Sequence, residues 1–303
     1  MVRHFLTLLD LTPEEALGLL DLADRLRGID ARDRLPGRTL GLIFEKPSLR
    51  TRVSFEAGMA QLGGSSIFLQ GKDVGLGVRE SVRDFARVIS QYVDMLAVRT
   101  FAHSILEELA AHASIPVINA LSDSAHPCQA MADLLTVRRV FGRLDDSLSI
   151  VFVGDGNNVA RSLAVACGLL GPRFTLAAPA AYDFPADFRA TFAAAFPGRE
   201  LRVVHDPTRA AVDADVIYTD VWTSMGQEAE SETRRSIFRP YQVDDALFSR
   251  ANRDAIFLHC LPAHRGEEVT DAVLDGPRSQ VVEQAANRMH FQKALLTWLM
   301  GRD

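Results

Sequence analysis

Nine short apolar runs, each of three to five residues, alternate with longer helical patterns along the whole chain. Strands joined by tight turns would pair antiparallel, whereas strands separated by helix-length segments pair parallel in βαβ units. The alternation therefore predicts an α/β fold. The predicted strands are 40–44, 66–69, 95–98, 117–120, 149–153, 175–178, 201–204, 216–218 and 256–258.

The strand pattern falls into two series. Turn formers and charged residues at 141–146 interrupt it, after four strands and before the other five. We therefore predict two doubly wound parallel-sheet domains joined by helices, residues 1–142 and 143–282. Residues 283–303 read as an amphipathic C-terminal helix that packs back on the first domain.

Charge and cysteine content narrow the class of protein. The 303 residues carry a formal net charge of −6 with a pI near 5.8, so no global field attracts nucleic acid or an acidic membrane surface. The three scattered cysteines form no disulfide framework or CxxC metal site. With no signal-like or membrane-spanning stretch, we expect a cytoplasmic protein without nucleic-acid or membrane partners.

The turn after the first predicted strand has the features of an anion site. Residues 45–52 read Glu-Lys-Pro-Ser-Leu-Arg-Thr-Arg and lead into a predicted helix. A helix start presents backbone N–H groups and positive dipole charge, to which Ser48, Thr51 and Arg50 or Arg52 add donors. The alternative is a helix capped by Ser48 with solvated arginines.

Three motifs together make the chain similar to a known family. Residues 48–52 (Ser-Leu-Arg-Thr-Arg) resemble the Ser-Thr-Arg-Thr-Arg signature of the aspartate and ornithine carbamoyltransferases. Residues 126–129 (His-Pro-Cys-Gln) and 259–262 (His-Cys-Leu-Pro) resemble two further signatures, in the family's order. Leu49 stands where the family usually has threonine. A main-chain N–H contact to phosphate survives that change, whereas a hydroxyl contact does not.

The resemblance implies that the first domain binds carbamoyl phosphate. It implies phosphate contacts from the 48–52 turn and carbamoyl contacts from the 126–129 turn, with Arg50 and His126 as catalytic residues. Taken alone, a lone histidine is more often structural and a lone arginine is usually a surface charge. The implied ligands are Ser48, Leu49, Arg50, Thr51, Arg99, His126 and Gln129, with Arg288 from the C-terminal helix.

The second domain is expected to bind the amine that accepts the carbamoyl group. By the resemblance, Asn158, the second asparagine of the turn after strand 149–153, binds the amino-acid carboxylate. The Gly154-Asp155-Gly156 part of the same turn invites a dinucleotide interpretation, but the full glycine pattern is missing. Residues 220–226 resemble the ornithine-type Asp-x-x-x-Ser-Met-Gly loop, in which Asp220 pairs with the α-ammonium group and Ser224 and Met225 meet the α-carboxylate.

Cys260 is implied as a catalytic residue beside the reacting amine, and Leu261 as a further contact to carbamoyl phosphate. Taken alone, Cys260 would be interpreted as a buried structural thiol, the commoner role of cysteine. A cysteine here, with Ser224 and Met225, favours ornithine over aspartate, whose second carboxylate needs cationic partners. Acetylornithine and putrescine remain alternative acceptors.

The family also implies a homotrimer and direct transfer between the two substrates, without a metal or an organic cofactor. A role in arginine biosynthesis is expected, and no role follows for residues 71–80. The rival interpretations are a nucleotide-dependent oxidoreductase and a non-catalytic module that binds carbamoyl phosphate or an amino acid.

Overall fold

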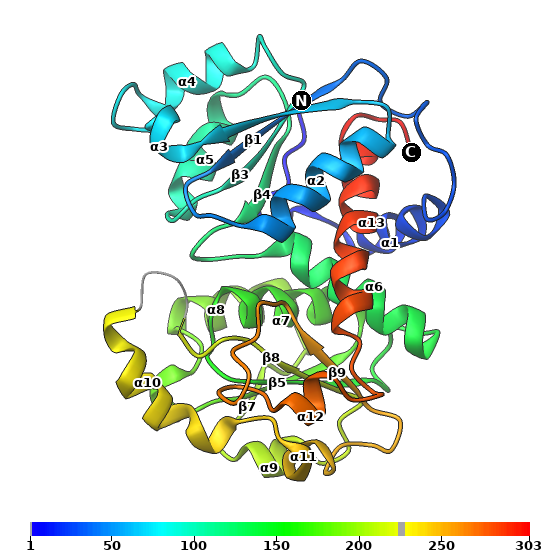
Figure 1. Ribbon diagram of the computed structural model, residues 1–303, viewed down its shortest axis with the longest axis vertical. Helices are drawn as coiled ribbons and strands as arrows, with labels where there is room; N and C mark the ends of the chain where they lie inside the picture. The colour runs from blue at the N-terminus through cyan, green and yellow to red at the C-terminus, as the bar shows by residue number, and fades with distance from the viewer. Residues whose placement is uncertain (1, 224–227) are drawn as a thin grey trace. The chain divides into compact units, whose positions relative to one another are not determined.

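The computed structural model describes residues 2–223 and 228–303. The chain forms two compact units (Figure 1). Unit 1 comprises Met1–Ala132 and Asn287–Asp303, and unit 2 comprises Asp133–Ala286. The divisions fall within two helices, α6 and α13.

Unit 1 is built on a four-stranded parallel sheet in the order β2-β1-β3-β4. The interior strand β1 is almost wholly buried, whereas the edge strand β2 alternates between exposed and half-buried residues. This follows from position, because an interior parallel strand is covered on both faces. The strands are β1 (Thr39–Phe44), β2 (Ser65–Gln70), β3 (Met95–Arg99) and β4 (Val117–Leu121).

Helices cover both faces of this sheet, with α4 and α5 on one side and α2 and α13 on the other (Figure 1). Apolar side chains such as Ile43, Leu96 and Val98 form the core beneath α4 and α5. The elements of unit 1 are η1 (Leu8–Asp10), α1 (Pro13–Arg25), α2 (Leu49–Gln61), α3 (Gly71–Val74), α4 (Val82–Ile89), α5 (His103–His112), the start of α6 (Pro127–Phe141) and most of α13 (Val281–Leu299).

The C-terminal helix packs on the first unit, as predicted. Phe291 of α13 packs against Phe5, with ring centroids 6.1 Å apart. The buried Lys293 donates from Nζ to the Leu26 carbonyl at 2.9 Å and to Gln61 Oε1 at 3.2 Å. One side chain thus ties α13 to the C-terminus of α1, where a cation is favoured, and to the end of α2.

Unit 2 contains a five-stranded parallel sheet in the order β7-β6-β5-β8-β9. In Figure 1, α7 and α8 lie on one side of it and α9 and α11 on the other. The strands are β5 (Ser149–Val153), β6 (Arg173–Ala177), β7 (Arg202–Val204), β8 (Val216–Thr219) and β9 (Ile256–His259). The other elements are α7 (Asn158–Leu170), η2 (Ala180–Tyr182), α8 (Ala186–Ala195), α9 (Pro207–Ala210), η3 (Glu228–Glu230), α10 (Ser231–Phe238), η4 (Arg239–Tyr241), α11 (Asp245–Phe248) and α12 (Asp271–Leu274).

Both sheets have a topological switch point, where successive connections turn in opposite directions. In unit 1 it lies between β1 and β3, and in unit 2 between β5 and β8. Ligands of open α/β sheets bind beyond the carboxyl ends of such strands. The turns that begin at Glu45, Thr100, Gly154 and Asp220 therefore form the natural place for a site in each unit.

The predicted α/β class and all nine predicted strands are confirmed, each with its ends within two residues of the prediction. The helix α2 begins at Leu49, within the segment 45–52 that was predicted to lead into it. The sequence motif 48–52 therefore lies at the N-cap and within the first turn. In the described part of the chain, none of the helices has the length and apolar character needed to span a membrane.

Candidate active site

In unit 1 the start of α2 presents unpaired backbone donors. Ser48 occupies the N-cap position, as in the capping alternative, but its side chain makes no capping hydrogen bond. Its hydroxyl instead donates to Thr51 Oγ1 at 3.0 Å. The N–H groups of Leu49, Arg50 and Thr51 have no acceptor within the helix, because the first turn has none to offer. They form a ready anion site beyond the end of β1.

A buried cluster joins this turn to α6 and α13. Arg288, which is 6% exposed, donates from Nη2 to Thr51 Oγ1 at 3.0 Å and from Nη1 to Gln129 Oε1 at 2.8 Å. Thr51 and Gln129 are each 1% exposed. Thr51 Oγ1 thus accepts from both Ser48 and Arg288, which leaves its own hydroxyl proton to donate to a ligand. Three predicted ligands from distant parts of the sequence are therefore in direct contact.

The two arginines of the motif have different environments. Arg50 is exposed in the first turn of α2. Arg52 pairs with Glu56 at 2.9 Å and lies over the Phe68 ring at 3.8 Å from its centroid. The sequence indicated either arginine as a phosphate ligand. Because Arg52 is held by Glu56 and Phe68, we favour Arg50 as the ligand. Leu49 is 76% exposed, and its side chain belongs to no core.

His126 lies at the start of α6 and is 4% exposed. Its carbonyl accepts from the N–H groups of Gln129 and Ala130, so it holds the N-cap position before Pro127. Burial, and then the positive charges of Arg288 and Arg99, hold the pKa of His126 well below its usual value of 6.5. The imidazole is therefore neutral near pH 7 and can donate one N–H without carrying a charge.

Arg99 ends β3, and its carbonyl accepts from the Glu45 N–H at 2.8 Å. This bond sets the ends of β1 and β3 side by side. Cys128 of the same 126–129 motif is a structural residue, because it is fully buried and burial raises the pKa of its thiol to about 12. Arg99 and Arg288 both act on His126, so two cations of unit 1 are gathered at one place although the chain is acidic overall.

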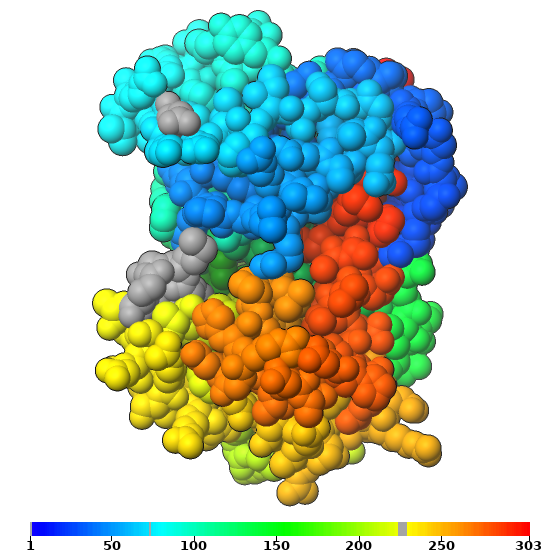
Figure 2. Space-filling model, in the orientation of Figure 1, coloured from blue at the N-terminus to red at the C-terminus, as the bar shows by residue number. Residues whose placement is uncertain are grey.

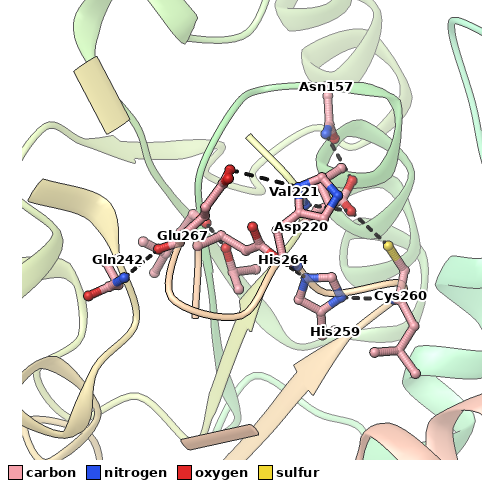
Figure 3. Close-up of polar contacts among 12 residues, drawn as sticks. Asn157, Asp220, Val221, Gln242, His259, Cys260, His264 and Glu267 are labelled. Carbon is pink, nitrogen blue, oxygen red and sulfur yellow. Dashed lines mark hydrogen bonds and ion pairs between the residues drawn. The ribbon is translucent and has the colours of Figure 1, made fainter. Parts of the chain in front are cut away.

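In unit 2 the turn after β5 is tied to the turn after β8. Asn157 caps α7 by accepting from the N–H groups of Val159 and Ala160 at 3.0 Å each. Its Nδ2 donates to Asp220 Oδ2 at 3.2 Å (Figure 3). The predicted ligand Asn158 is the first residue of α7. The sequence analysis gave Asn157 no role, although asparagine before a helix is a recognisable N-cap.

Asp220 and Cys260 are in direct contact. Cys260 Sγ lies 2.9 Å from Asp220 Oδ1 and donates to it (Figure 3). Asp220 is 8% exposed, and Cys260 is partly exposed. Both oxygens of the carboxylate thus have a partner in the protein. A buried carboxylate beside a thiol can hold a cationic amine and accept its proton.

A buried pair of side chains, His259 and Glu268, lies next to the Cys260–Leu261 segment. His259 Nδ1 accepts from the Leu261 N–H at 2.8 Å, which leaves the proton on Nε2, 3.2 Å from Glu268 Oε1. Both side chains are fully buried. Leu261 has a positive φ of 58°, a strained conformation that these contacts support. The predicted ligands Ser224 and Met225 lie outside the described residues.

Two clusters in the described part of the chain could hold a metal ion by residue type, with ligand atoms within 4.8 Å of one another. They are Asp220, His259 and Cys260, and His264, Glu267 and Glu268. In the first cluster the Cys260–Asp220 and His259–Glu268 bonds already use the ligand atoms. A metal ion would have to displace these bonds.

The Gly154-Asp155-Gly156 turn is filled by the protein itself. A Cβ on Gly156 would lie 3.0 Å from the backbone of Asp183 and Phe184, so this glycine serves close packing. Asp155 forms an ion pair with the buried Arg234. Both features argue against a dinucleotide loop. Nothing in the sequence pointed to Arg234, which lies in a polar segment with several other charged residues.

Comparison with known proteins gives consistent matches over the whole chain. The family model "Aspartate/ornithine carbamoyltransferase, carbamoyl-P binding domain" matches residues 3–139. The model "Aspartate/ornithine carbamoyltransferase, Asp/Orn binding domain" matches residues 146–299. The chain is 52% identical over 297 residues to an ornithine carbamoyltransferase of Bacillus subtilis (strain 168), which covers 97% of this chain and 92% of the relative.

Solved structures share the fold. The ornithine carbamoyltransferase from Pyrococcus furiosus matches with a TM-score of 0.94 and 48% identity, covering 99% of this chain and 97% of the other. An acetylornithine transcarbamylase complexed with acetylcitrulline matches with a TM-score of 0.88 and 31% identity, covering 98% and 99% of the two chains. The fold is thus shared by proteins whose names give different acceptors.

Proposed function

The chain belongs to the aspartate/ornithine carbamoyltransferase family, and from this premise we propose that it transfers the carbamoyl group of carbamoyl phosphate to the δ-amine of L-ornithine. The products are L-citrulline and phosphate. The observation that carries the choice of acceptor is the buried Asp220 carboxylate, held by Asn157 and Cys260. A carboxylate favours a cationic amino acid, whereas the side chain of aspartate would bring a second anion.

We assign the binding of carbamoyl phosphate chiefly to residues of unit 1. The N–H groups at the start of α2 and the guanidinium groups of Arg50, Arg99 and Arg288 supply donors and positive charge for the phosphate. The neutral His126 and Gln129 supply donors for the carbamoyl group. The full proposed set is Ser48, Leu49, Arg50, Thr51, Arg99, His126, Gln129 and Arg288, with Cys260 and Leu261 from unit 2.

We assign ornithine to unit 2. Asp220 binds the α-ammonium group, and Asn158, Ser224 and Met225 bind the α-carboxylate. Cys260 lies next to the δ-amine. Its bond to Asp220 supports this role, because a thiol paired with a carboxylate offers the amine an acceptor for its proton.

The proposed reaction is a direct transfer. An alkyl ammonium group has a pKa of about 10.4, so ornithine must lose a proton from its δ-nitrogen before it reacts. The neutral amine attacks the carbonyl carbon, and negative charge develops on the carbonyl oxygen, where Arg50, Thr51 and His126 are assigned to stabilise it. Collapse then breaks the carbon–oxygen bond to phosphate, and the second proton of the attacking nitrogen leaves with the phosphate. No electron is transferred, so the step needs no redox cofactor.

We further propose a homotrimer that works in the cytoplasm in arginine biosynthesis. The edge strand β2 and the neighbouring helix α2 support an interface, because Val53 and Ile67 are about half exposed, at 50% and 48%. Figure 2 shows this segment on the visible face of unit 1. Uncovered edge strands are normally protected or paired. The three cysteines are thiols and form no disulfide, which suits a reducing compartment.

The proposal is tested by measuring citrulline and phosphate formation with ornithine, acetylornithine, putrescine and aspartate in parallel. Ornithine-dependent turnover that is lost in Arg50→Ala is the expected result. Turnover only with another amine would leave the carbamoyl-phosphate ligands as assigned, but would show that the role given to Asp220 in binding ornithine is wrong. Binding of both substrates without phosphate release would favour the non-catalytic module.

A further inference from the structure

Arg234 is a buried arginine that the proposed reaction does not use. It lies in α10, and its side chain is 5% exposed. Its guanidinium carbon is 4.7 Å from the centroid of the Tyr182 ring and 5.3 Å from that of Phe238. Burying an arginine costs free energy unless it is paired and bonded, so its contacts should be specific.

Two strand-end turns meet at this guanidinium group. Nη2 donates to Asp155 Oδ2, in the turn between β5 and α7. Nε donates to the carbonyl of Trp222, two residues after Asp220 and beyond the end of β8. The remaining charged contact is loose, because Glu230 lies 3.9 Å from Nη1 and its side chain is 66% exposed.

These turns carry the proposed ornithine ligands. The first continues from Asp155 to Asn157, which binds Asp220, and to Asn158. The second begins at Asp220. The turns lie at the switch point of the unit 2 sheet, beyond Val153 and Thr219, where the pairing of β5 with β8 ends. The Asn157–Asp220 bond and the two bonds from Arg234 link the two turns.

The geometry requires an arginine. A guanidinium group carries its donors in a rigid plane, so Nε and Nη2 can serve two acceptors at fixed positions at once. A lysine at this position keeps the charge but replaces the fork with one flexible ammonium group. Burial raises the pKa of Asp155 and the bond from Arg234 opposes that rise, so the arginine favours the ionised form of this carboxylate.

We propose that Arg234 is a positioning residue for the amino-acid acceptor: it clamps the turns after β5 and β8 and so fixes Asn158 and Asp220 at the spacing that the acceptor requires. This inference rests on the proposed function. It predicts that a loosened clamp weakens ornithine binding more than carbamoyl phosphate binding, because the latter is assigned chiefly to residues of unit 1.

The test is steady-state kinetics of the full chain with each substrate varied in turn. The variants are Arg234→Lys, Arg234→Met, Asp155→Asn and the double variant Arg234→Met/Asp155→Asn. Arg235→Met is the matched control, since Arg235 is the next residue of α10, is 53% exposed and pairs with Glu267. Thermal unfolding of each variant separates loss of fold from loss of binding.

We expect Arg234→Lys to raise the KM for ornithine by roughly tenfold to a hundredfold, the effect of losing a charged hydrogen bond, with the KM for carbamoyl phosphate within about twofold of wild type. The double variant removes both charges of the ion pair but leaves the Trp222 carbonyl without its donor. It should therefore stay impaired for ornithine even where its thermal stability recovers. Arg235→Met should behave as wild type.

Several results would overturn the inference. Wild-type kinetics in Arg234→Lys, or an equal rise in both KM values, would show that Arg234 has a structural role and does not position the acceptor. Full kinetic recovery in the double variant would show that only the unpaired charge mattered. If Arg234→Met fails to fold, Arg234→Lys still decides the question. A wild-type chain that does not use ornithine would refute the proposed function first, and this inference with it.

Discussion

Arg50 and Arg52 are two arginines of one motif with different environments. Arg50 is exposed among the N–H donors of α2, whereas Arg52 is engaged by Glu56 and Phe68. We expect Arg50→Ala to lower kcat/KM by about a hundredfold or more, the usual cost of removing a donor from a developing oxyanion. Arg52→Ala should change it by less than about threefold. Steady-state assays of both variants check this, and equal losses would contradict the assignment.

His126 should make stability depend on pH. Folding lowers its pKa, because burial and the charges of Arg288 and Arg99 disfavour the imidazolium form. Below its ordinary pKa of 6.5 the unfolded chain takes up a proton that the folded chain does not. The native state is therefore fully favoured above about pH 6.5 and loses up to about 1.4 kcal/mol per pH unit as the pH falls from there towards the folded pKa.

The measurement is the urea midpoint at pH 7.5 and 5.5 for wild type, His126→Asn and the exposed control His112→Asn. The midpoint of His126→Asn should fall less with acid than that of wild type, while His112→Asn should follow wild type. A steeper acid dependence in His126→Asn than in wild type would refute the direction of the shift.

The turn from α2 to β2 makes a close backbone contact at Gly63. Gly63 has a φ of +86°, and a Cβ there would lie 1.9 Å from the Arg32 carbonyl oxygen. Gly37 has a similar φ of +74° but has open space around it. Gly63→Ala should therefore cost more than about 2 kcal/mol, and Gly37→Ala about 1 kcal/mol from backbone conformation alone.

Thermal and urea unfolding of the two glycine variants separates the cost of the steric contact from the cost of the backbone conformation. Because both carry the same substitution in a left-handed conformation, the difference between them measures the steric contact with Arg32. Equal destabilisation would mean that residues 31–35 move aside without cost.

For the molecule as a whole, the exposed face of α2 and β2 should decide the assembly. We expect the double variant Val53→Glu/Ile67→Lys to shift the proposed trimer to monomer in analytical ultracentrifugation, because charges in an apolar interface are costly to desolvate. Val212→Glu, at a site 52% exposed in unit 2, is the control. A wild-type monomer, or a double variant that remains trimeric, would contradict the proposed interface.

Much of this protein could be predicted from the sequence because the information is local. Strand positions follow from short buried runs such as 149–153, and the class follows from their spacing. The resemblance of three motifs led to the family, which the comparisons confirm. The 48–52 and 126–129 motifs indicated Thr51 and Gln129, which the structure brings together on Arg288.

Other features are decided only by the tertiary structure, because they depend on residues far apart in the chain. Arg288 contacts Thr51 across 237 positions, and Arg234 contacts Asp155 across 79. The contact of Arg52 with Phe68 and the neutral state of His126 also depend on residues far apart in the chain. A pattern in the sequence reports which side chains a segment carries. Their charge state and their partners depend on burial and on neighbours that only the folded sheets bring within hydrogen-bonding distance.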